Sequence, residues 1–245
     1  QIIVDELTGI RAQFGDKRRS VIELNTQDLG IEDFITPQDM VVTLSHTGYI
    51  KAQPLADYRA QRRGGRGKQA AAVKEDDFVD HLFVANTHDY ILCFSNCGRV
   101  YWLKVYEVPQ GTRTGRGKPI VNMFPLEEGE KINAILSIKE FVEDRFIFMC
   151  TSQGTVKKTP LSDFSNPRKA GIIAVALDEG DYLIGAEITS GTQDIVLVSD
   201  AGKAVWFDEE DVRPMGRTAR GVRGMKLGAG QQVLSLLVAE NHQET

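Results

Sequence analysis

Residues 91–102 read Ile91-Leu92-Cys93-Phe94-Ser95-Asn96-Cys97-Gly98-Arg99-Val100-Tyr101-Trp102. Here an apolar run is followed by a short turn that ends in glycine and by a second run rich in aromatic and β-branched residues, which is typical of a β-hairpin. The pattern of four mostly apolar residues, Ser or Thr, two variable residues and Gly occurs four times, with its glycines at Gly48, Gly98, Gly154 and Gly202. The chain therefore repeats a hairpin unit about every fifty residues.

Two further positions keep the register of these hairpins. Nine residues after each hairpin glycine stands an acid, which we expect to anchor a turn; these acids are Asp57, Glu107, Asp163 and Asp211. A second glycine follows 17 or 19 residues after the first, at Gly67, Gly117, Gly171 and Gly221. Two more strand-like runs come after it, so each repeat supplies about four short strands, which is the blade unit of a propeller-like array.

The sequence thus predicts an all-β array of four-stranded blades, with four repeats and a stub of a fifth. In this prediction Val233 to Val238 is the opening strand of the fifth repeat. Trp102 and Trp206 stand at equivalent repeat positions and are interpreted as blade core.

The first residues follow a different pattern. Apolar side chains recur at helical spacing at Ile3, Leu7, Ile10 and Phe14, which predicts a short helix. A helix packed on the blades is one interpretation; the one we favour is the end of a helix from a preceding domain. The predicted domains are therefore residues 1–20, the helix end and linker, and residues 21–245, the β array.

Composition excludes several classes of protein. The chain has 245 residues, of which 42% are hydrophobic and 26% are charged, as in soluble globular domains. No apolar run reaches the 18 or so residues that a membrane span needs, and the first residues lack the apolar core of a secretory signal. Three cysteines do not make a disulfide scaffold, which suits a reducing cytoplasm.

The net charge of −5 hides a strong asymmetry within the repeats. We counted charges in the window of each repeat that runs from the residue after the hairpin glycine to the residue after the second glycine. The net charge is +5 for residues 49–68, +4 for 99–118, +3 for 155–172 and zero for 203–222. Their total is +12, so the rest of the chain carries −17. If the blades stack around an axis, the basic windows line up along one rim, which is the electrostatic footprint of a polyanion such as duplex DNA. The fourth window, being neutral, should matter least.

The densest basic window is Gln61-Arg62-Arg63-Gly64-Gly65-Arg66-Gly67-Lys68. Glycines between arginines let the backbone approach a phosphate chain, and each guanidinium can bind phosphate oxygens with two donors. The stretch is not a P-loop, because Arg62 and Gln69 stand where that motif requires Gly and Ser or Thr. A flexible loop is the competing interpretation of such a run.

The first seven residues of this stretch, Gln61-Arg62-Arg63-Gly64-Gly65-Arg66-Gly67, resemble the seven-residue box of the A subunit of bacterial DNA gyrase. The surrounding stretches Phe14-Gly15-Asp16-Lys17-Arg18-Arg19, Thr43-Leu44-Ser45-His46-Thr47-Gly48-Tyr49 and Val84-Ala85-Asn86-Thr87-His88-Asp89 resemble the same family, and the resemblance covers nearly the whole chain. It implies the C-terminal DNA-wrapping domain of that family, which is a β-pinwheel whose neighbouring blades exchange strands. That family domain commonly has six blades, which leaves open whether four repeats close into a ring.

The resemblance also implies a function. The domain would bind and bend duplex DNA around a basic outer rim, wrapping it with a fixed hand, so that gyrase introduces negative supercoils in ATP-dependent strand passage. The implied partners are double-stranded DNA, the B subunit and the rest of the A subunit, in an A2B2 tetramer; the fragment itself is expected to be monomeric, cytoplasmic and nucleoid-associated. ATP and Mg²⁺ are implied for other domains of the enzyme, and neither a cofactor nor a catalytic residue is expected here.

Two alternatives to the gyrase assignment stay open. One is the equivalent domain of topoisomerase IV, in which the box is typically degenerate, and the other is a propeller-like module that binds an acidic protein. A zinc site at His81, His88, Cys93 and Cys97 is disfavoured because the spacing fits no common zinc pattern. The predicted DNA contacts are Gln61, Arg62, Arg63, Gly64, Gly65, Arg66, Gly67, Lys68, Arg113, Arg116, Lys118, Lys157, Lys158, Arg168, Lys169, Arg217, Arg220 and Arg223.

Overall fold

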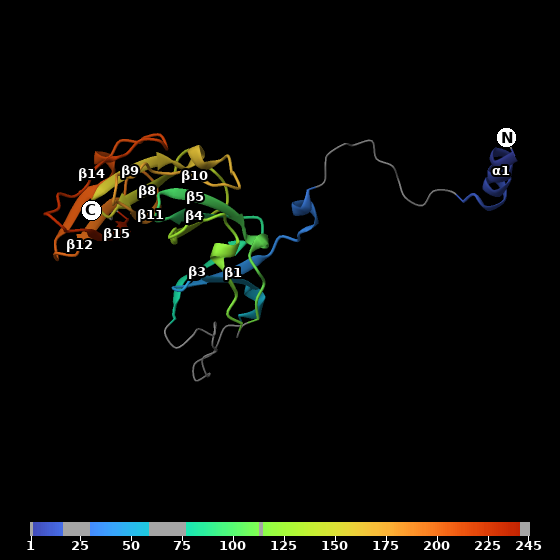
Figure 1. The fold of residues 1–245 in the computed structure, drawn as a ribbon, viewed down its shortest axis with the longest axis horizontal. Helices are drawn as coiled ribbons and strands as arrows, with labels where there is room; N and C mark the ends of the chain where they lie inside the picture. Colours follow the sequence, from blue (N-terminus) through green and yellow to red (C-terminus); the bar gives the residue numbers. More distant parts are fainter. Residues whose placement is uncertain (1, 17–29, 59–76, 113–114, 241–245) are drawn as a thin grey trace, which may run out of the picture. The chain divides into compact units, whose positions relative to one another are not determined.

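The computed structural model describes residues 2–16, 30–58, 77–112 and 115–240. The chain divides into two compact units, Gln1–Phe34 and Ile35–Thr245. The first unit contains the predicted helix, α1 (Ile2–Phe14), and a 3-10 turn, η1 (Ile31–Phe34) (Figure 1). Ile3, Leu7 and Ile10 on α1 are exposed. Among the described residues, no helix is both long and apolar enough to cross a membrane.

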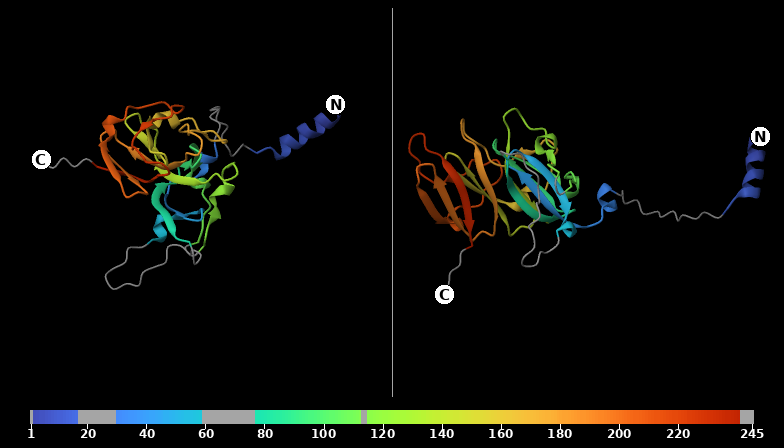
Figure 2. Two further views of the ribbon diagram at one scale, coloured as in Figure 1. Left: turned by 60° about the vertical axis from the view of Figure 1, so that its left-hand side comes forward. Right: turned by 90° about the horizontal axis from the view of Figure 1, so that it is seen from below.

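The described part of the second unit consists of four antiparallel sheets, one for each repeat, that follow one another along an arc (Figures 1 and 2). Sheet one contains β1 (Asp39–Ser45), β2 (Tyr49–Pro54), β3 (Val79–Asn86) and β6 (Lys118–Pro119). Sheet two contains β4 (Tyr90–Ser95), β5 (Arg99–Lys104), β7 (Ile132–Ile138) and β10 (Ile172–Ile173). Sheet three contains β8 (Phe146–Thr151), β9 (Thr155–Pro160), β11 (Leu183–Thr189) and β14 (Val222–Arg223). Sheet four contains β12 (Asp194–Ser199), β13 (Ala204–Asp208) and β15 (Val233–Ala239).

The recurring Ser or Thr and Gly close each hairpin in the same way. In the second repeat, the Gly98 amide donates to the Ser95 carbonyl (3.0 Å) and the Arg99 amide donates to the Ser95 hydroxyl (3.3 Å). Gly98 has a φ of 73°, a left-handed conformation that glycine adopts without strain. The hydroxyls of Ser45, Thr151 and Ser199 accept the equivalent amide in the other repeats. The motif is therefore a turn device, and it explains why the sequence keeps both residue types.

Neighbouring sheets exchange a short strand, as the resemblance implied. The strand that follows the second glycine leaves its own repeat and pairs with the second hairpin strand of the preceding repeat: β6 with β2, β10 with β5, and β14 with β9. The carbonyl of the hairpin glycine anchors the exchanged segment; in the second sheet, Gly98 O accepts from the amides of Ala174 (2.8 Å) and Val175 (3.1 Å). The fold is thus the predicted all-β pinwheel.

The hydrophobic core lies between the sheets and not within them. Among the described residues, one apolar cluster joins sheets one and two around Val42 and Tyr101, and a second joins sheets two and three around Phe94 and Phe164. A third cluster joins sheets three and four around Phe148. Because every cluster is built from two sheets, and sheets two and three each contribute to two clusters, a single repeat cannot bury its apolar face alone.

Two predictions about the fourth repeat are wrong. The segment Val233–Ala239 pairs with β12 and so belongs to the fourth sheet. It occupies the edge position that β3, β7 and β11 occupy in the first three sheets, and it does not open a fifth repeat. Trp206 is 68% exposed and is not core. Its equivalent Trp102 is partly buried and donates from Nε1 to the Phe164 carbonyl (2.9 Å) of the next repeat. This position packs against the following repeat, and within the described residues no such repeat covers β13.

The four acids that stand nine residues after a hairpin glycine all lie in 3-10 turns that follow the second hairpin strand; they are Asp57, Glu107, Asp163 and Asp211. These turns are η2 (Leu55–Asp57), η3 (Val105–Glu107), η5 (Leu161–Phe164) and η6 (Glu209–Asp211); a further turn, η4 (Ile120–Asn122), follows β6. The expected anchoring role is confirmed for Glu107, whose Oε2 accepts from the Lys104 amide (2.9 Å).

Candidate nucleic-acid interface

The basic windows map onto one structural position. We use the name rim loops for the described residues of the segments that join a 3-10 turn to the next exchanged strand, which are residues 108–112 with 115–117, residues 165–171 and residues 212–221. The first and third of these run beside the second hairpin strand of the preceding sheet, where Ala52 bridges to Gln110 and Lys158 to Pro214. Each four-stranded sheet has the exchanged strand at one edge and β3, β7 or β11 at the other, so the rim loops lie at the edge opposite β3, β7 and β11. Since β7 contacts β3 and β11, and β11 contacts β15, the rim loops lie on the outward edge.

Six predicted contacts are exposed side chains on or directly after these loops. They are Arg116, Lys118, Arg168, Lys169, Arg220 and Arg223. Arg217 is half-buried. These cations occur at equivalent places in successive repeats, so the outward edge presents a row of positive charges with spacing set by the repeat.

Local contacts orient some of these groups. The Arg116 guanidinium lies over the Tyr49 ring, 5.3 Å from its centroid, which is a cation–π geometry. Arg220 Nη1 lies 2.6 Å from Asp178 Oδ1, and both side chains are mostly exposed. An exposed pair of this kind contributes little to stability, so a phosphate can compete for the arginine.

Two predicted contacts are wrong. Lys157 and Lys158 on β9 are 0% and 4% exposed, and their ammonium groups bind carbonyls inside the protein. Lys157 Nζ donates to the carbonyls of Ala174 (2.8 Å) and Arg217, while Lys158 Nζ donates to the Glu209 carbonyl (2.9 Å) and lies 3.9 Å from Glu209 Oε1. Neither lysine can reach a phosphate chain on the surface, so half of the positive charge counted in the third window is structural.

The box residues Gln61 to Lys68 and Arg113 lie outside the described residues, and their predicted role as DNA contacts stays a prediction.

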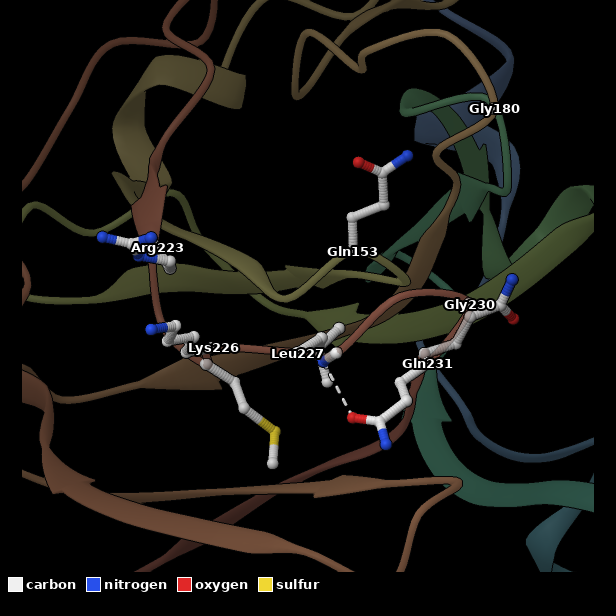
Figure 3. Close-up of a pocket in the computed structure, with 10 residues that line it drawn as sticks. Gln153, Gly180, Arg223, Lys226, Leu227, Gly230 and Gln231 are labelled. Atoms are coloured by element: carbon white, nitrogen blue, oxygen red, sulfur yellow. Dashed lines mark hydrogen bonds between the residues drawn. The ribbon is translucent and has the colours of Figure 1, made fainter.

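The structure adds a cation that the window count omitted. Lys226 lies with Arg223 on one side of a cavity of about 490 Å³ between the third hairpin turn and the segment after β14, and Gly230 and Gln231 lie on the opposite side (Figure 3). Gln153 and Gln232 also line it, and none of its described lining residues is acidic. The sequence signal was a basic residue three positions after Arg223, just beyond the window boundary. This polar cavity begins just after the third rim loop, at Arg223, and extends toward the start of β15 at Gln232.

The residues considered for zinc are not gathered into a site. Within the described part of the chain, no group of three or more His, Cys, Asp or Glu side chains could hold a metal ion. Cys93 is buried in β4, and desolvation raises the pKa of its thiol well above the usual range.

The strand exchange, the repeat and the row of exposed cations together define a β-pinwheel domain. The family model described as the DNA gyrase C-terminal domain, beta-propeller, matches residues 39–86, 89–139, 145–190 and 193–240, which are the four repeats seen in the structure. The chain belongs to this DNA gyrase A C-terminal domain family.

Its relatives agree with this assignment. The chain is 58% identical over 238 residues to the DNA gyrase A subunit of Salmonella typhimurium, a match that covers 97% of this chain and 27% of the relative. It therefore spans about a quarter of the length of the gyrase A proteins it matches.

Two solved structures share the fold. One is the C-terminal domain of DNA topoisomerase IV, with a TM-score of 0.73 and 29% identity over 83% of this chain and 62% of that one. The other is a DNA gyrase A C-terminal domain, with a TM-score of 0.61 and 28% identity over 82% and 65%. The fold is common to both enzymes, while the sequence relatives favour gyrase.

Proposed function

We propose that the second unit binds duplex DNA along its outward edge and bends the duplex around the arc of sheets. The observation that supports this most directly is the repetition of exposed cations on successive rim loops, Arg116 on one, Arg168 and Lys169 on the next, and Arg220 on the third. Contacts to phosphates position a protein on DNA but carry little sequence information, so we expect weak sequence preference. Bending a short site costs roughly 1–6 kcal/mol, which the additional phosphate contacts along the arc offset.

For the whole protein, of which this chain matches about a quarter, the proposal is DNA gyrase activity. Chiral wrapping by this domain would present a neighbouring duplex for strand passage and so introduce negative supercoils. The proposed partners are the B subunit and the rest of the A subunit, in an A2B2 assembly in the cytoplasm, with ATP and Mg²⁺ bound by other domains.

The first experiment is topological. The 245-residue chain is bound to relaxed circular DNA, the circles are treated with a nicking-closing enzyme, the protein is removed, and the linking number is read. We expect a shift that grows with bound protein and disappears at high salt. Binding without a shift would contradict wrapping by this unit, and no binding at all would favour the protein-binding alternative.

The second experiment counts phosphate contacts in the third repeat. Arg168→Ala with Lys169→Ala removes two exposed cations from one rim loop, and should reduce the slope of log K against log salt by about two units. The matched control is Lys131→Ala with Lys139→Ala, two exposed lysines outside the rim loops. Equal slopes for the two double variants would refute the rim-loop interface.

A further inference from the structure

Two buried lysines occupy the same place in different repeats. Lys51 on β2 and Lys157 on β9 each stand three residues after a hairpin glycine, and they are 1% and 0% exposed. Burying an ammonium group is costly unless its hydrogen bonds are satisfied, so these lysines need a structural reason. Neither belongs to the exposed row of cations described above.

Each ammonium group binds the backbone of the rim loop that belongs to the next repeat. Lys51 Nζ donates to the carbonyls of Thr112 (3.3 Å) and Gly115 (2.9 Å), and the Lys157 ammonium donates to the carbonyl of Arg217. These partners are about sixty residues away in sequence. Arg116 directly follows one of the fixed carbonyls, and Arg217 carries another. The lysines thus fix the backbone at the points from which the arginines project.

The second repeat achieves the same end differently. Its equivalent residue is Tyr101, whose hydroxyl donates to Glu130 Oε1 (3.0 Å), and the rim loop 165–171 is held by Arg99, whose Nη2 donates to the Ala170 carbonyl (2.7 Å). The lysine contact is therefore specific to the loops of the second and fourth repeats.

We propose that Lys51 and Lys157 are positioning residues for DNA binding, each holding one rim loop so that the arginines of that loop face the phosphate chain. This inference rests on the proposed function. It assigns Lys51 to Arg116, and Lys157 to Arg217 and Arg220.

The charged groups around Lys157 make its contact sensitive to pH. Desolvation, and then the Arg217 guanidinium on the rim loop, lower the pKa of Lys157 to about 8, against a smaller opposing effect of Asp163 on η5. Exposed lysines and arginines stay charged well above this pH. The ammonium donors that hold the 212–221 loop are therefore weakened between pH 7 and 9.

The test is a crossed set of double-variant cycles on DNA affinity. Lys157→Met keeps the aliphatic stem and removes the donors, and should weaken binding about tenfold, the effect of losing one charge-assisted hydrogen bond. In a chain that already carries Arg217→Ala and Arg220→Ala, the same change should have little further effect, whereas with Arg116→Ala the effects should add. Lys51→Met should have little further effect in a chain that carries Arg116→Ala, and its effect should add to that of Arg217→Ala with Arg220→Ala.

A wild-type pH series checks the idea without any variant that could fail to fold. Affinity of the wild-type chain for a short duplex should fall from pH 7 to 9, as the Lys157 ammonium group loses its proton. Additive effects in every cycle, or a flat wild-type profile, would overturn the positioning role while leaving DNA binding intact. Failure of the wild-type chain to bind the duplex would overturn the proposed function itself.

Discussion

The hairpin glycines offer a test of strand exchange in which the same substitution is made at equivalent positions. Gly98 and Gly202 have nearly equal φ values of 73° and 71°, so alanine incurs the same left-handed penalty of about 1–2 kcal/mol at both. The two glycines differ in the atoms that an added Cβ would contact. A Cβ at Gly98 would be 2.6 Å from the Val175 carbonyl oxygen on the exchanged segment, whereas a Cβ at Gly202 has no described atom within 4 Å.

The extra cost at Gly98 can be worked out from these contacts. To relieve a 2.6 Å approach, the exchanged segment must move, and overpacking of this kind costs about 1–3 kcal/mol. The movement also weakens the two hydrogen bonds that Ala174 and Val175 donate to Gly98 O, each of which contributes about 0.5–1.5 kcal/mol. Gly98→Ala should therefore destabilise the chain by about 2–4 kcal/mol more than Gly202→Ala.

The assay is urea unfolding, with the free energy of unfolding in water obtained by linear extrapolation. Gly154→Ala should fall between the two, because its Cβ would be 2.9 Å from the Met225 carbonyl oxygen, and Gly48→Ala should resemble Gly202→Ala, because its nearest neighbour, Ile120 Cγ2, is at 3.7 Å. Amide exchange at Ala174 and Val175 should accelerate only in Gly98→Ala. If all four variants lose the same stability within about 0.5 kcal/mol, the account of the exchanged segment is wrong.

Two further predictions concern buried and hydrogen-bonded acids. Glu209 is 0% exposed, lies beside buried Lys158, and accepts hydrogen bonds from the Thr189 hydroxyl and the Gly191 amide. Glu209→Gln should therefore lower the free energy of unfolding in urea by about 3 kcal/mol, whereas the same change at its exposed neighbour, Glu210→Gln, should alter it by less than about 0.5 kcal/mol. Equal effects of the two variants would contradict a buried ion pair. Desolvation raises the pKa of Asp77, but hydrogen bonds from the Thr47 hydroxyl and amide and from the Phe78 amide outweigh it and lower the pKa to about 2. This carboxylate therefore contributes stability above pH 3.8 that is lost as pH falls toward 2. The melting temperatures of the wild type and Asp77→Asn should differ at pH 6 and at pH 4, and should converge only as pH falls from 3.8 toward 2; a gap that stays constant down to pH 2 would refute the shift.

Much of the fold could be predicted from the sequence because its signals are local. The Ser or Thr and Gly of each turn bond to each other within five residues, so a single hairpin turn such as Ser95 to Arg99 is specified by its own residues. The register acid at Glu107 and the helical stripe of α1 are equally short-range. Conformational preferences and nearest-neighbour hydrogen bonds act over a few residues, which is why these elements could be placed correctly.

The candidate interface could be predicted only in part. The row of exposed cations at Arg116, Arg168 and Arg220 follows from charge counted in register with the repeat, because loop residues after a turn are usually solvated. The same count included Lys157 and Lys158, which a lysine-rich strand gives no local reason to exclude. It missed Lys226, which lies outside the window yet beside Arg223.

The repeat, its hairpins, its charge pattern and the family to which the chain belongs all follow from the order of the amino acids. The tertiary structure alone decided which repeat each strand joins and which side chains are buried. Val233–Ala239 closes the fourth sheet, Trp102 is covered while Trp206 is not, and Lys157 binds a loop sixty residues away. The physical reason is that burial here arises between repeats: a position becomes core only when a neighbouring repeat packs on it, and that contact cannot be read within any one repeat.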